Sequence, residues 1–360
     1  MKYLFIVQGE GRGHLTQAIS LSQLLRGNGH EVVAVLVGRC SNRELPSFFI
    51  EKIGAQVSRF DSPSIDYGSK GKDGSVIKTL ARNLLPAKVK KWRKSVDFIA
   101  AQIKQSEADV VVNFYELLMG FTNLFHNIKV PTVSLAHQFL IDHEDYAHRS
   151  TSSYGQFILR LSNRFTNWGS SKTLALSLYS LNDDSTRDLF TVPPLLRREI
   201  FEMTPQSGGY ILGYMLNPAY LEEVVKWKRK NPECEVHIFW DKKSAPEEVE
   251  HMPRLWLHRI DDRKFLKYME QCDGYISTAG FESICEAMYL GKPTLMIPAH
   301  LEQRINAIDA QGAGAGVESK NYNIGQLKDF IPKYTGDTEG FRAWVKSADE
   351  LYLRHLTEDL

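Results

Sequence analysis

The chain has 360 residues, of which 43% are hydrophobic, and this is enough for two domains that each bury a core. Its formal net charge of +1, without a recognition motif, argues against nucleic acid as a partner. The four cysteines form no CxxC pair and no cluster with histidine, which predicts a reducing compartment and no zinc site. No window approaches the roughly 18 apolar residues of a membrane-spanning helix, so we expect a cytoplasmic protein.

The chain begins with an apolar run at residues 3–7 that leads straight into a glycine loop. This run is too short for the apolar segment of a signal peptide, so we interpret it as a first strand. Further apolar runs at residues 32–37, 110–112 and 132–135 alternate with helical stretches. Such alternation is typical of a doubly wound parallel sheet, and it predicts a Rossmann-like α/β domain over residues 1–195.

A glycine-rich loop follows the first predicted strand. It contains Gly9, Gly11 and Gly13, and His14 stands where a dinucleotide-binding fingerprint would place its third glycine. Because open α/β sheets bind ligands at the carboxyl ends of their strands, we expect Gly11 and Gly13 to contact a ligand there. Histidine titrates near neutral pH, so His14 is a candidate general base. The alternatives are a purely structural turn and a histidine that only caps the following helix.

The basic residues are concentrated in the first half of the chain. Residues 1–190 carry 23 Lys and Arg against 17 Asp and Glu, a net +6, which leaves 21 against 26, a net −5, for the remainder. Six of these basic residues lie between Arg82 and Lys94, interleaved with Leu85 and Trp92. Such a stretch can lie on an anionic membrane surface as a peripheral contact. The alternative is a solvated helix face.

A second α/β series follows a break in the pattern. Three prolines and two glycines lie between residues 191 and 209, and we place a linker between domains at residues 196–209. Residues 210–337 then form a second predicted Rossmann-like domain. Its apolar runs lie at residues 210–215, 235–240, 255–257, 274–277 and 294–297. Residues 338–360 have apolar side chains at helical spacing and predict a C-terminal helix that docks on either domain.

The segment from Tyr275 to Asn306 contains a strand, a turn, a helix over residues 281–290, a second short strand and a polar loop. The helix begins directly after the turn, so its unpaired N–H groups and positive dipole end favour a phosphate group. Ser283 and Glu286 are three residues apart and share one helix face. A hydroxyl near the turn suits a phosphate, and a carboxylate one turn later suits a vicinal diol. The alternative for Glu286 is a solvent-facing acid.

Together these blocks resemble the GT-B glycosyltransferases, most closely their inverting nucleotide-diphosphate-sugar branch. The branch includes the lipid-linked N-acetylglucosaminyltransferase of peptidoglycan synthesis, the galactolipid synthases and the small-molecule UDP-glucosyltransferases. Residues 11–32 (GRGHLTQAISLSQLLRGNGHEV) are similar to the first loop and helix of the branch, and residues 257–306 are similar to its donor site. The resemblance implies two Rossmann-like domains with an interdomain cleft.

The resemblance also implies specific contacts with the donor. Arg259 and Ile260 would hold the nucleobase, and Glu286 would accept hydrogen bonds from the ribose hydroxyls. Glu302 and Gln303 would grip the hydroxyls of the transferred sugar, and the alternative for this pair is an ordinary polar loop. The residues implied to face the diphosphate are Thr278, Ala279, Gly280 and Ser283.

Two positions depart from the pattern of the branch. Its plant-type members often have histidine where this chain has Thr278, so the phosphate contact loses a cation here. A carboxylate on a neighbouring strand orients the catalytic histidine of the branch, but this chain has Asn113 there. Either Glu116 replaces that carboxylate, or His14 works without an ionised partner, or another group is the base. His137, at the end of a predicted strand, is the second candidate base and alternatively a structural histidine.

We therefore expect an inverting glycosyltransferase that moves a hexose or N-acetylhexosamine from a nucleotide-diphosphate sugar, most simply a UDP-sugar, to an acceptor hydroxyl. The chain has no Asp-x-Asp triplet, so we expect no metal and no cofactor beyond this co-substrate. The alternatives are a nucleotide-sugar epimerase or hydrolase of the same fold, a nicotinamide oxidoreductase, and a non-catalytic nucleotide-binding protein. The acceptor stays open among a lipid, a glycan and a small molecule.

Overall fold

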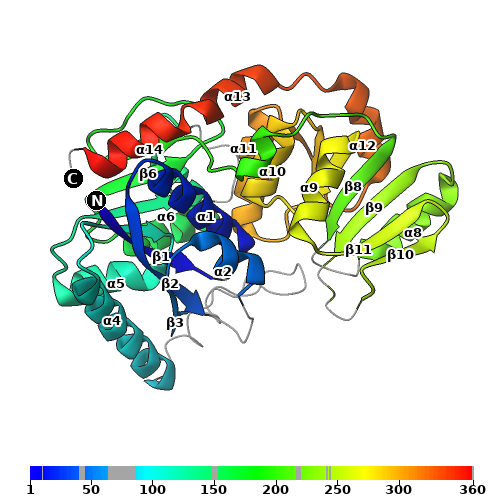
Figure 1. The fold of residues 1–360 in the computed structure, drawn as a ribbon. Helices are drawn as coiled ribbons and strands as arrows, with labels where there is room; N and C mark the ends of the chain where they lie inside the picture. The colour runs from blue at the N-terminus through cyan, green and yellow to red at the C-terminus, as the bar shows by residue number, and fades with distance from the viewer. Residues whose placement is uncertain are drawn as a thin grey trace. The chain divides into compact units, whose positions relative to one another are not determined.

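The computed structural model describes residues 1–9, 11–39, 45–63, 86–146, 153–215, 220–240, 242 and 245–358 (Figure 1). The chain folds into two compact units. The first comprises Met1–Arg197 together with Trp344–Leu360, and the second comprises Arg198–Ala343. Each unit contains one seven-stranded sheet, which confirms the predicted α/β class with two Rossmann-like sheets.

The sheet of the first unit is parallel throughout and has the strand order β3-β2-β1-β4-β5-β6-β7. Its strands are β1 (Lys2–Gln8), β2 (Glu31–Arg39), β3 (Val57–Asp61), β4 (Val110–Phe114), β5 (Thr132–Ala136), β6 (Lys172–Leu176) and β7 (Leu189–Val192). The chain proceeds from β1 outward to β3 on one side and then returns to β4 on the other. The strand order therefore reverses between β1 and β4, which is where open α/β sheets bind ligands.

Helices cover both faces of this sheet. Leu4 and Ile6 of β1 pack in one core with residues of α4 and α5. The alternate residue Phe5 points to the opposite face and is also fully buried, as a parallel sheet with two covered faces requires. The helices of this part of the chain are α1 (Arg12–Gly27), α2 (Ser47–Ile53), α4 (Pro86–Ser106), α5 (Leu117–His126), the 3-10 helix η1 (His137–Asp142) and α6 (Ser153–Thr166).

The sheet of the second unit has the order β10-β11-β9-β8-β12-β13-β14, and only β10 runs antiparallel to its neighbour among the described strands. Ile211, Ile238, Ile276 and Leu295 form the centre of its core. The strands are β8 (Tyr210–Met215), β9 (Glu235–Trp240), β10 (Glu248–Met252), β11 (Leu255–Arg259), β12 (Gly274–Ser277), β13 (Thr294–Met296) and β14 (Gly316–Glu318). The helices are α7 (Arg198–Phe201), α8 (Leu221–Lys230), α9 (Asp262–Gln271), α10 (Phe281–Tyr289), α11 (Leu301–Gly312), α12 (Ile324–Phe330) and the 3-10 helix η3 (Ile331–Lys333).

The C-terminal segment differs from the single helix that we predicted. It forms α13 (Thr338–Lys346) and α14 (Ala348–Thr357), which are separated at Ser347. The last helix, α14, belongs to the first unit: the Tyr352 hydroxyl donates to the carbonyl of Pro193 (2.8 Å), and the Tyr3 hydroxyl donates to the carbonyl of Leu356 (2.9 Å). These buried hydrogen bonds join the end of the chain to its beginning.

The predicted linker region also has structure of its own. It contains α7, and the residues after α7 are bonded to the second unit. The backbone N–H of Gln206 donates to the carbonyl of Glu270 (2.9 Å), and that of Gly208 donates to the carbonyl of Gln271 (2.7 Å). The stretch that precedes β8 is therefore fixed to the carboxyl end of α9.

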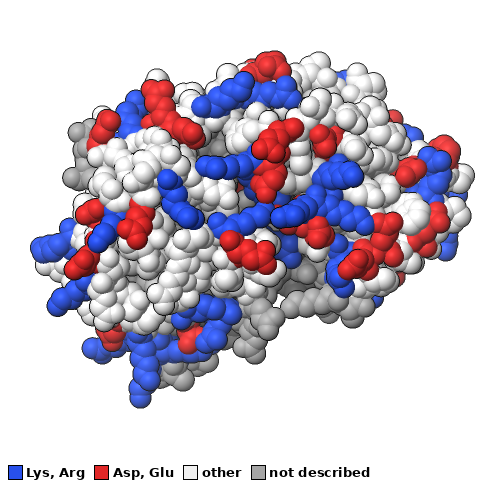
Figure 2. Space-filling view, viewed as in Figure 1, with Lys and Arg blue, Asp and Glu red and all other residues white. Residues whose placement is uncertain are grey.

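The basic stretch between Arg82 and Lys94 falls largely on α4. Residues 82–85 lie outside the described part of the chain, and Figure 2 shows Lys and Arg side chains gathered over α4. Trp92 is half-buried against the core of the first unit, and Lys91 pairs with Asp61 at 3.0 Å. No helix among the described residues is both long and apolar enough to cross a bilayer.

Candidate active site

His14 lies just beyond the carboxyl end of β1, in the first turn of α1. The helix begins at Arg12, so Gly13 and His14 are helical, and Gly11, the N-cap residue, has an extended backbone. No side chain caps α1, so His14 is not the capping residue that was the alternative.

The His14 ring is buried between an amide and an aromatic ring. Its Nδ1 lies 3.2 Å from Oε1 of Gln17, and its plane stacks on Tyr115 at a centroid separation of 6.0 Å and an angle of 21°. Burial lowers the pKa of His14 to about 4, and the hydrogen bond with Gln17 opposes part of that shift. The imidazole is therefore neutral at physiological pH, the form in which it can accept a proton.

The side chains of Glu116 and Asn113 form hydrogen bonds with neighbouring residues of the first unit. The Glu116 carboxylate accepts from the Ser62 hydroxyl (2.6 Å) and from the N–H of Leu118 (3.2 Å), which caps α5. The carboxylate also lies against Gly38, where an added Cβ would come 2.1 Å from Glu116 Oε2. Asn113 donates to the carbonyl of Thr166 and accepts from the N–H of Glu116. These contacts join the carboxyl ends of β2, β3 and β4.

His137 follows β5 directly and opens η1. Its Nδ1 donates to the carbonyl of Leu176 at 2.8 Å, and the side chain is buried. This bond links the ends of β5 and β6, which is the structural role that we gave as the alternative for this histidine. His14 and His137 thus both lie at the carboxyl edge of the first sheet.

The turn between β12 and α10 lies at the carboxyl edge of the second sheet. Ala279 has a left-handed backbone (φ +58°), and the Asn306 side chain donates to its carbonyl at 3.1 Å. Gly280 is the N-cap of α10 and has no side chain to cap it, and the positive dipole end of the helix lies at this turn. The Ser283 hydroxyl donates to the carbonyl of Gly280 (3.1 Å) and lies 3.3 Å from that of Ser277. Thr278 completes the turn and is buried.

The remaining predicted donor residues also belong to the second unit. Glu286 is only 2% exposed, so it is not the solvent-facing acid that was its alternative. Arg259 is the last residue of β11 and pairs with Glu247 at 3.0 Å, and Ile260 follows the strand. Glu302 and Gln303 were predicted to lie in a loop. They lie instead in the first turn of α11, which begins at Leu301. Gln303 accepts from the N–H of Ala299 at 2.9 Å.

Comparison with protein families gives one match over most of the chain. Residues 1–334 match the model of glycosyl transferase family 1. The chain belongs to glycosyl transferase family 1.

Individual relatives of this glycosyltransferase are more distant. Mogroside IIIx synthase of Siraitia grosvenorii is 33% identical over a match that covers 26% of the chain and 24% of that protein, so the match spans about a quarter of the relative's length. The glycosyltransferase SsfS6 of Streptomyces sp. SF2575, solved with thymidine diphosphate, superposes with a TM-score of 0.63 at 15% identity over 99% of this chain and 100% of its own. UGT2 of Phytolacca americana, solved with UDP-2fluoro-glucose and pterostilbene, gives 0.59 at 13% identity over 99% and 95%. These two structures share the GT-B fold with this chain.

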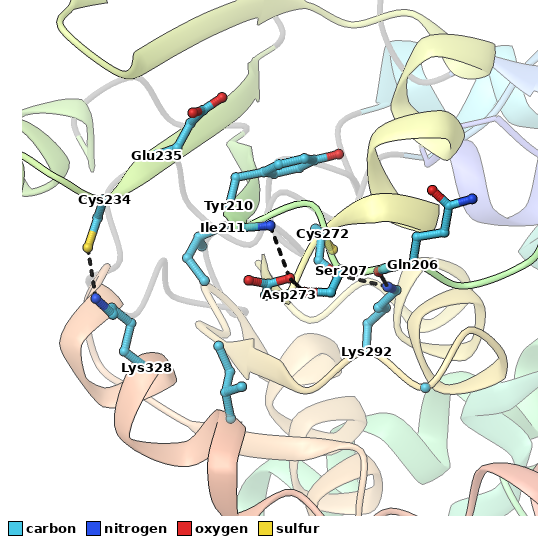
Figure 3. A pocket seen from close by; sticks show the side chains of 13 residues that line it. Gln206, Ser207, Tyr210, Ile211, Cys234, Glu235, Cys272, Asp273, Lys292 and Lys328 are labelled. Atoms are coloured by element: carbon cyan, nitrogen blue, oxygen red, sulfur yellow. Dashed lines mark hydrogen bonds between the residues drawn. The ribbon is translucent and has the colours of Figure 1, made fainter.

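A cavity of about 500 Å³ in the glycosyltransferase lies away from these residues. It is lined by the amino ends of β8, β9 and β12, at the edge of the second sheet opposite the Ala279 turn (Figure 3). Lys292 is buried there and donates to the carbonyls of Gln206 (2.6 Å) and Cys272 (2.8 Å), as Figure 3 shows. We assign Lys292 to the anchoring of the segment before β8.

The sequence analysis of this glycosyltransferase did not predict two residues that contact His14, Gln17 and Tyr115. Gln17 is signalled only by its spacing, because residues three apart on a helix share a face. Tyr115 has a left-handed backbone (φ +58°), and its hydroxyl donates to Asn163 Oδ1 at 2.7 Å. No pattern in the sequence marks such a tyrosine, since its position depends on the turn between β4 and α5.

Proposed function

We propose that the protein is an inverting glycosyltransferase that moves a hexose or N-acetylhexosamine from a UDP-sugar to an acceptor hydroxyl. The observation that carries this proposal is the amino end of α10 directly after the Ala279 turn, with Ser283 in its first turn and the buried carboxylate of Glu286 one turn later. A diphosphate suits the N–H groups and dipole of the helix end, and a ribose diol suits the carboxylate. SsfS6 with thymidine diphosphate and UGT2 with UDP-2fluoro-glucose support a nucleotide-diphosphate donor.

The proposed step is a single displacement at the anomeric carbon. His14 accepts the proton of the acceptor hydroxyl, and the acceptor oxygen forms a bond to the anomeric carbon. The bond from that carbon to the diphosphate oxygen breaks, and the diphosphate leaves with the electron pair. Because the attack comes from the side opposite the leaving group, the configuration is inverted. The amino end of α10 stabilises the charge that develops on the diphosphate.

The contacts with the sugar and the base follow from the same assignment. We propose that Glu302 and Gln303 bind hydroxyls of the transferred sugar from the first turn of α11. Arg259 and Ile260 are proposed to hold the uracil at the end of β11. Thr278 contributes a hydroxyl to the diphosphate turn in place of the histidine that plant-type members often carry.

A matched pair of variants on α10 tests the donor site. Glu286→Gln removes the buried carboxylate, whereas Glu282→Gln removes a half-buried carboxylate from the same helix and serves as its control. A hydrogen bond to a charged group contributes about 1.5–3 kcal/mol, so Glu286→Gln is expected to weaken UDP binding roughly 10- to 100-fold by calorimetry. Equal effects of the two variants would remove Glu286 from the ribose site.

A panel of ligands tests the nucleotide and the reaction class. UDP is expected to raise the melting temperature more than TDP, GDP or NAD, because a ligand that binds only the folded state stabilises it. A larger rise in melting temperature with TDP would show that the donor nucleotide is TDP and not UDP. A larger rise with NAD would favour an oxidoreductase. Free sugar or an epimer formed from a UDP-sugar without acceptor would favour the hydrolase or epimerase alternative.

The basic outer face of α4 is proposed as a peripheral contact with an anionic membrane that carries the acceptor. Val89 is 44% exposed on this helix, next to Lys88 and Lys90. Co-sedimentation with vesicles of phosphatidylcholine and phosphatidylserine is expected to fall for the double variant Lys90→Gln, Arg93→Gln. Equal sedimentation of the wild type with neutral and anionic vesicles would leave α4 as a solvated face.

A further inference from the structure

The hydrogen-bond partner of His14 is an amide, whereas the resemblance led us to expect a carboxylate. Among the described residues, Gln17 is the only one bonded to the His14 ring, through Nδ1 and Oε1 at 3.2 Å. Asn113, at the expected carboxylate position, is bonded to the backbone of Thr166 and Glu116. The His14 ring therefore has a neutral partner, Gln17, which lies three residues later on the same helix.

We propose that Gln17 is the positioning residue of His14, and that it holds the imidazole in the tautomer with the proton on Nδ1. This proposal rests on the proposed function of His14 as the base. An amide oxygen only accepts hydrogen bonds, so the ring nitrogen that faces it carries the proton. In a neutral histidine, the hydrogen bonds that the two ring nitrogens make decide which of them carries the proton. Nε2 then keeps its lone pair and can take the acceptor proton.

The surroundings fix the ring in this orientation. Gln17 is buried, and both residues belong to α1, so the spacing of three residues keeps them on one face. Tyr115 stacks on the imidazole and is itself held by the bond from its hydroxyl to Asn163 and by an edge contact with Phe139 at 5.3 Å. Among the described residues, none bonds to Nε2 of His14.

Because Gln17 is neutral, it can orient the His14 ring without adding a negative charge beside it. Tyr115 is the titratable side chain that faces the ring, and the nearby Glu116 carboxylate binds Ser62 and the N–H of Leu118. Among the described residues, burial and Gln17 are the two causes that shift the pKa of His14, and no charged group contributes. Gln17 therefore selects the tautomer without holding a compensating negative charge beside the protonated ring.

Ring-nitrogen NMR of His14 tests the tautomer without any sugar present. In the full-length protein at pH 7, with the His14 signals identified by their loss in His14→Gln, we expect the Nδ1–H form. Gln17→Leu removes the acceptor and is expected to move the population toward the Nε2–H form. An Nε2–H tautomer in the wild type, or unchanged spectra in Gln17→Leu, would overturn the proposal.

Gln17→Glu supplies a second variant that keeps an acceptor at the same place. A carboxylate 3 to 4 Å from the ring favours its charged form, so the pKa of His14 is expected to rise by about 1–3 units. The acidic limb of kcat/KM is expected to move to higher pH with it. Gln23→Glu, on the same helix, adds the same charge and is expected to leave both unchanged. An equal shift in Gln23→Glu would show a general effect of charge on α1.

Kinetics separate a failure of this inference from a failure of the proposed function. Gln17→Leu is expected to lower kcat roughly 10²-fold, with KM for the donor within twofold, because only the proton transfer depends on the tautomer. Melting temperatures identify any variant that fails to fold. Correct spectra without sugar transfer would refute the function and leave the positioning role intact. Normal transfer in Gln17→Leu, with His14→Ala inactive, would refute the positioning role alone.

Discussion

The two units bury histidines in opposite ways. In the first unit, His14 has an amide at Nδ1 and a tyrosine ring on its face. In the second, His237 and His258 bond to each other (2.9 Å), while His237 Nε2 contacts Glu235 at 3.0 Å and His258 Nδ1 lies 3.2 Å from Glu248. Burial lowers the pKa of all three rings, to about 4 for His14 and His258.

The difference lies in what each ring can still do. Every ring nitrogen of the pair in the second unit lies against a side chain of the protein, and the pair links β9, β11 and β10 across the sheet. These contacts hold the strands together. The His14 ring has one nitrogen engaged within the described chain, so the other is available for chemistry. Burial is thus compatible with a structural role for His237 and His258 and with the proposed role of His14 as a base.

Removal of the His14 ring gives the largest expected effect. His14→Ala takes away the proposed base, and kcat is expected to fall roughly 10³-fold, within the range that general base catalysis supplies. The melting-temperature shift caused by UDP is expected to stay the same, because the proposed UDP contacts lie in the second unit. Turnover within tenfold of the wild type would transfer the role to another group, and His137→Ala would then be measured.

Acid is expected to destabilise both units through their histidines. The pKa of His14 is about 4 in the folded protein, below the value of about 6.5 for an unperturbed histidine, so the unfolded chain binds the proton first. Stability is therefore complete above pH of about 6.5 and falls toward pH 4, by about 1.4 kcal/mol per pH unit for each such group. Urea unfolding between pH 7 and 4.5 measures this slope.

A pair of histidine variants assigns part of that slope to His14. His14→Gln is expected to reduce the slope, whereas His251→Gln, which alters an exposed residue of β10, is expected to leave it unchanged. A slope that His14→Gln does not alter would mean that the ring is accessible to protons in the folded state.

Opening the network of the second unit has the smallest expected effect. His237→Leu leaves Nε2 of the buried His258 without its partner, at a cost of about 1–3 kcal/mol, whereas Glu235 keeps its ion pair with Arg254. Urea unfolding measures this loss, and turnover per folded molecule is expected to stay within twofold. Loss of turnover without loss of stability would contradict the structural role of this network.

The parts of the fold that could be predicted are those with continuous apolar runs. The predicted runs at residues 210–215, 235–240 and 274–277 coincide with β8, β9 and β12, because buried parallel strands are apolar on both faces. Among the strands that no prediction covered, β10 is a largely exposed edge strand, EVEHM, and β14 has three residues. Such strands exist through pairing with a neighbour, which local sequence does not record.

In the candidate site, too, the parts formed by consecutive residues could be predicted, and the parts formed by residues distant in the chain could not. The turn and helix from Thr278 to Glu286 could be located because a strand, a turn and a helix follow one another in the chain. The surroundings of His14 could not, since Tyr115 reaches the ring from the turn after β4, more than one hundred residues later. Glu302 and Gln303 were placed in a loop because Pro298 and His300 interrupt the pattern just before α11 begins.

The position of α14 has a consequence for synthesis on the ribosome. The first unit needs residues from 344 onward, which are translated only after the whole second unit. Until they emerge, the Tyr3 hydroxyl and the carbonyl of Pro193 lack the partners that Leu356 and Tyr352 provide. The second unit is thus the first whose sequence is complete, although the other unit begins the chain. Domains generally fold as units during synthesis, so we expect the later half of this protein to mature before the earlier one.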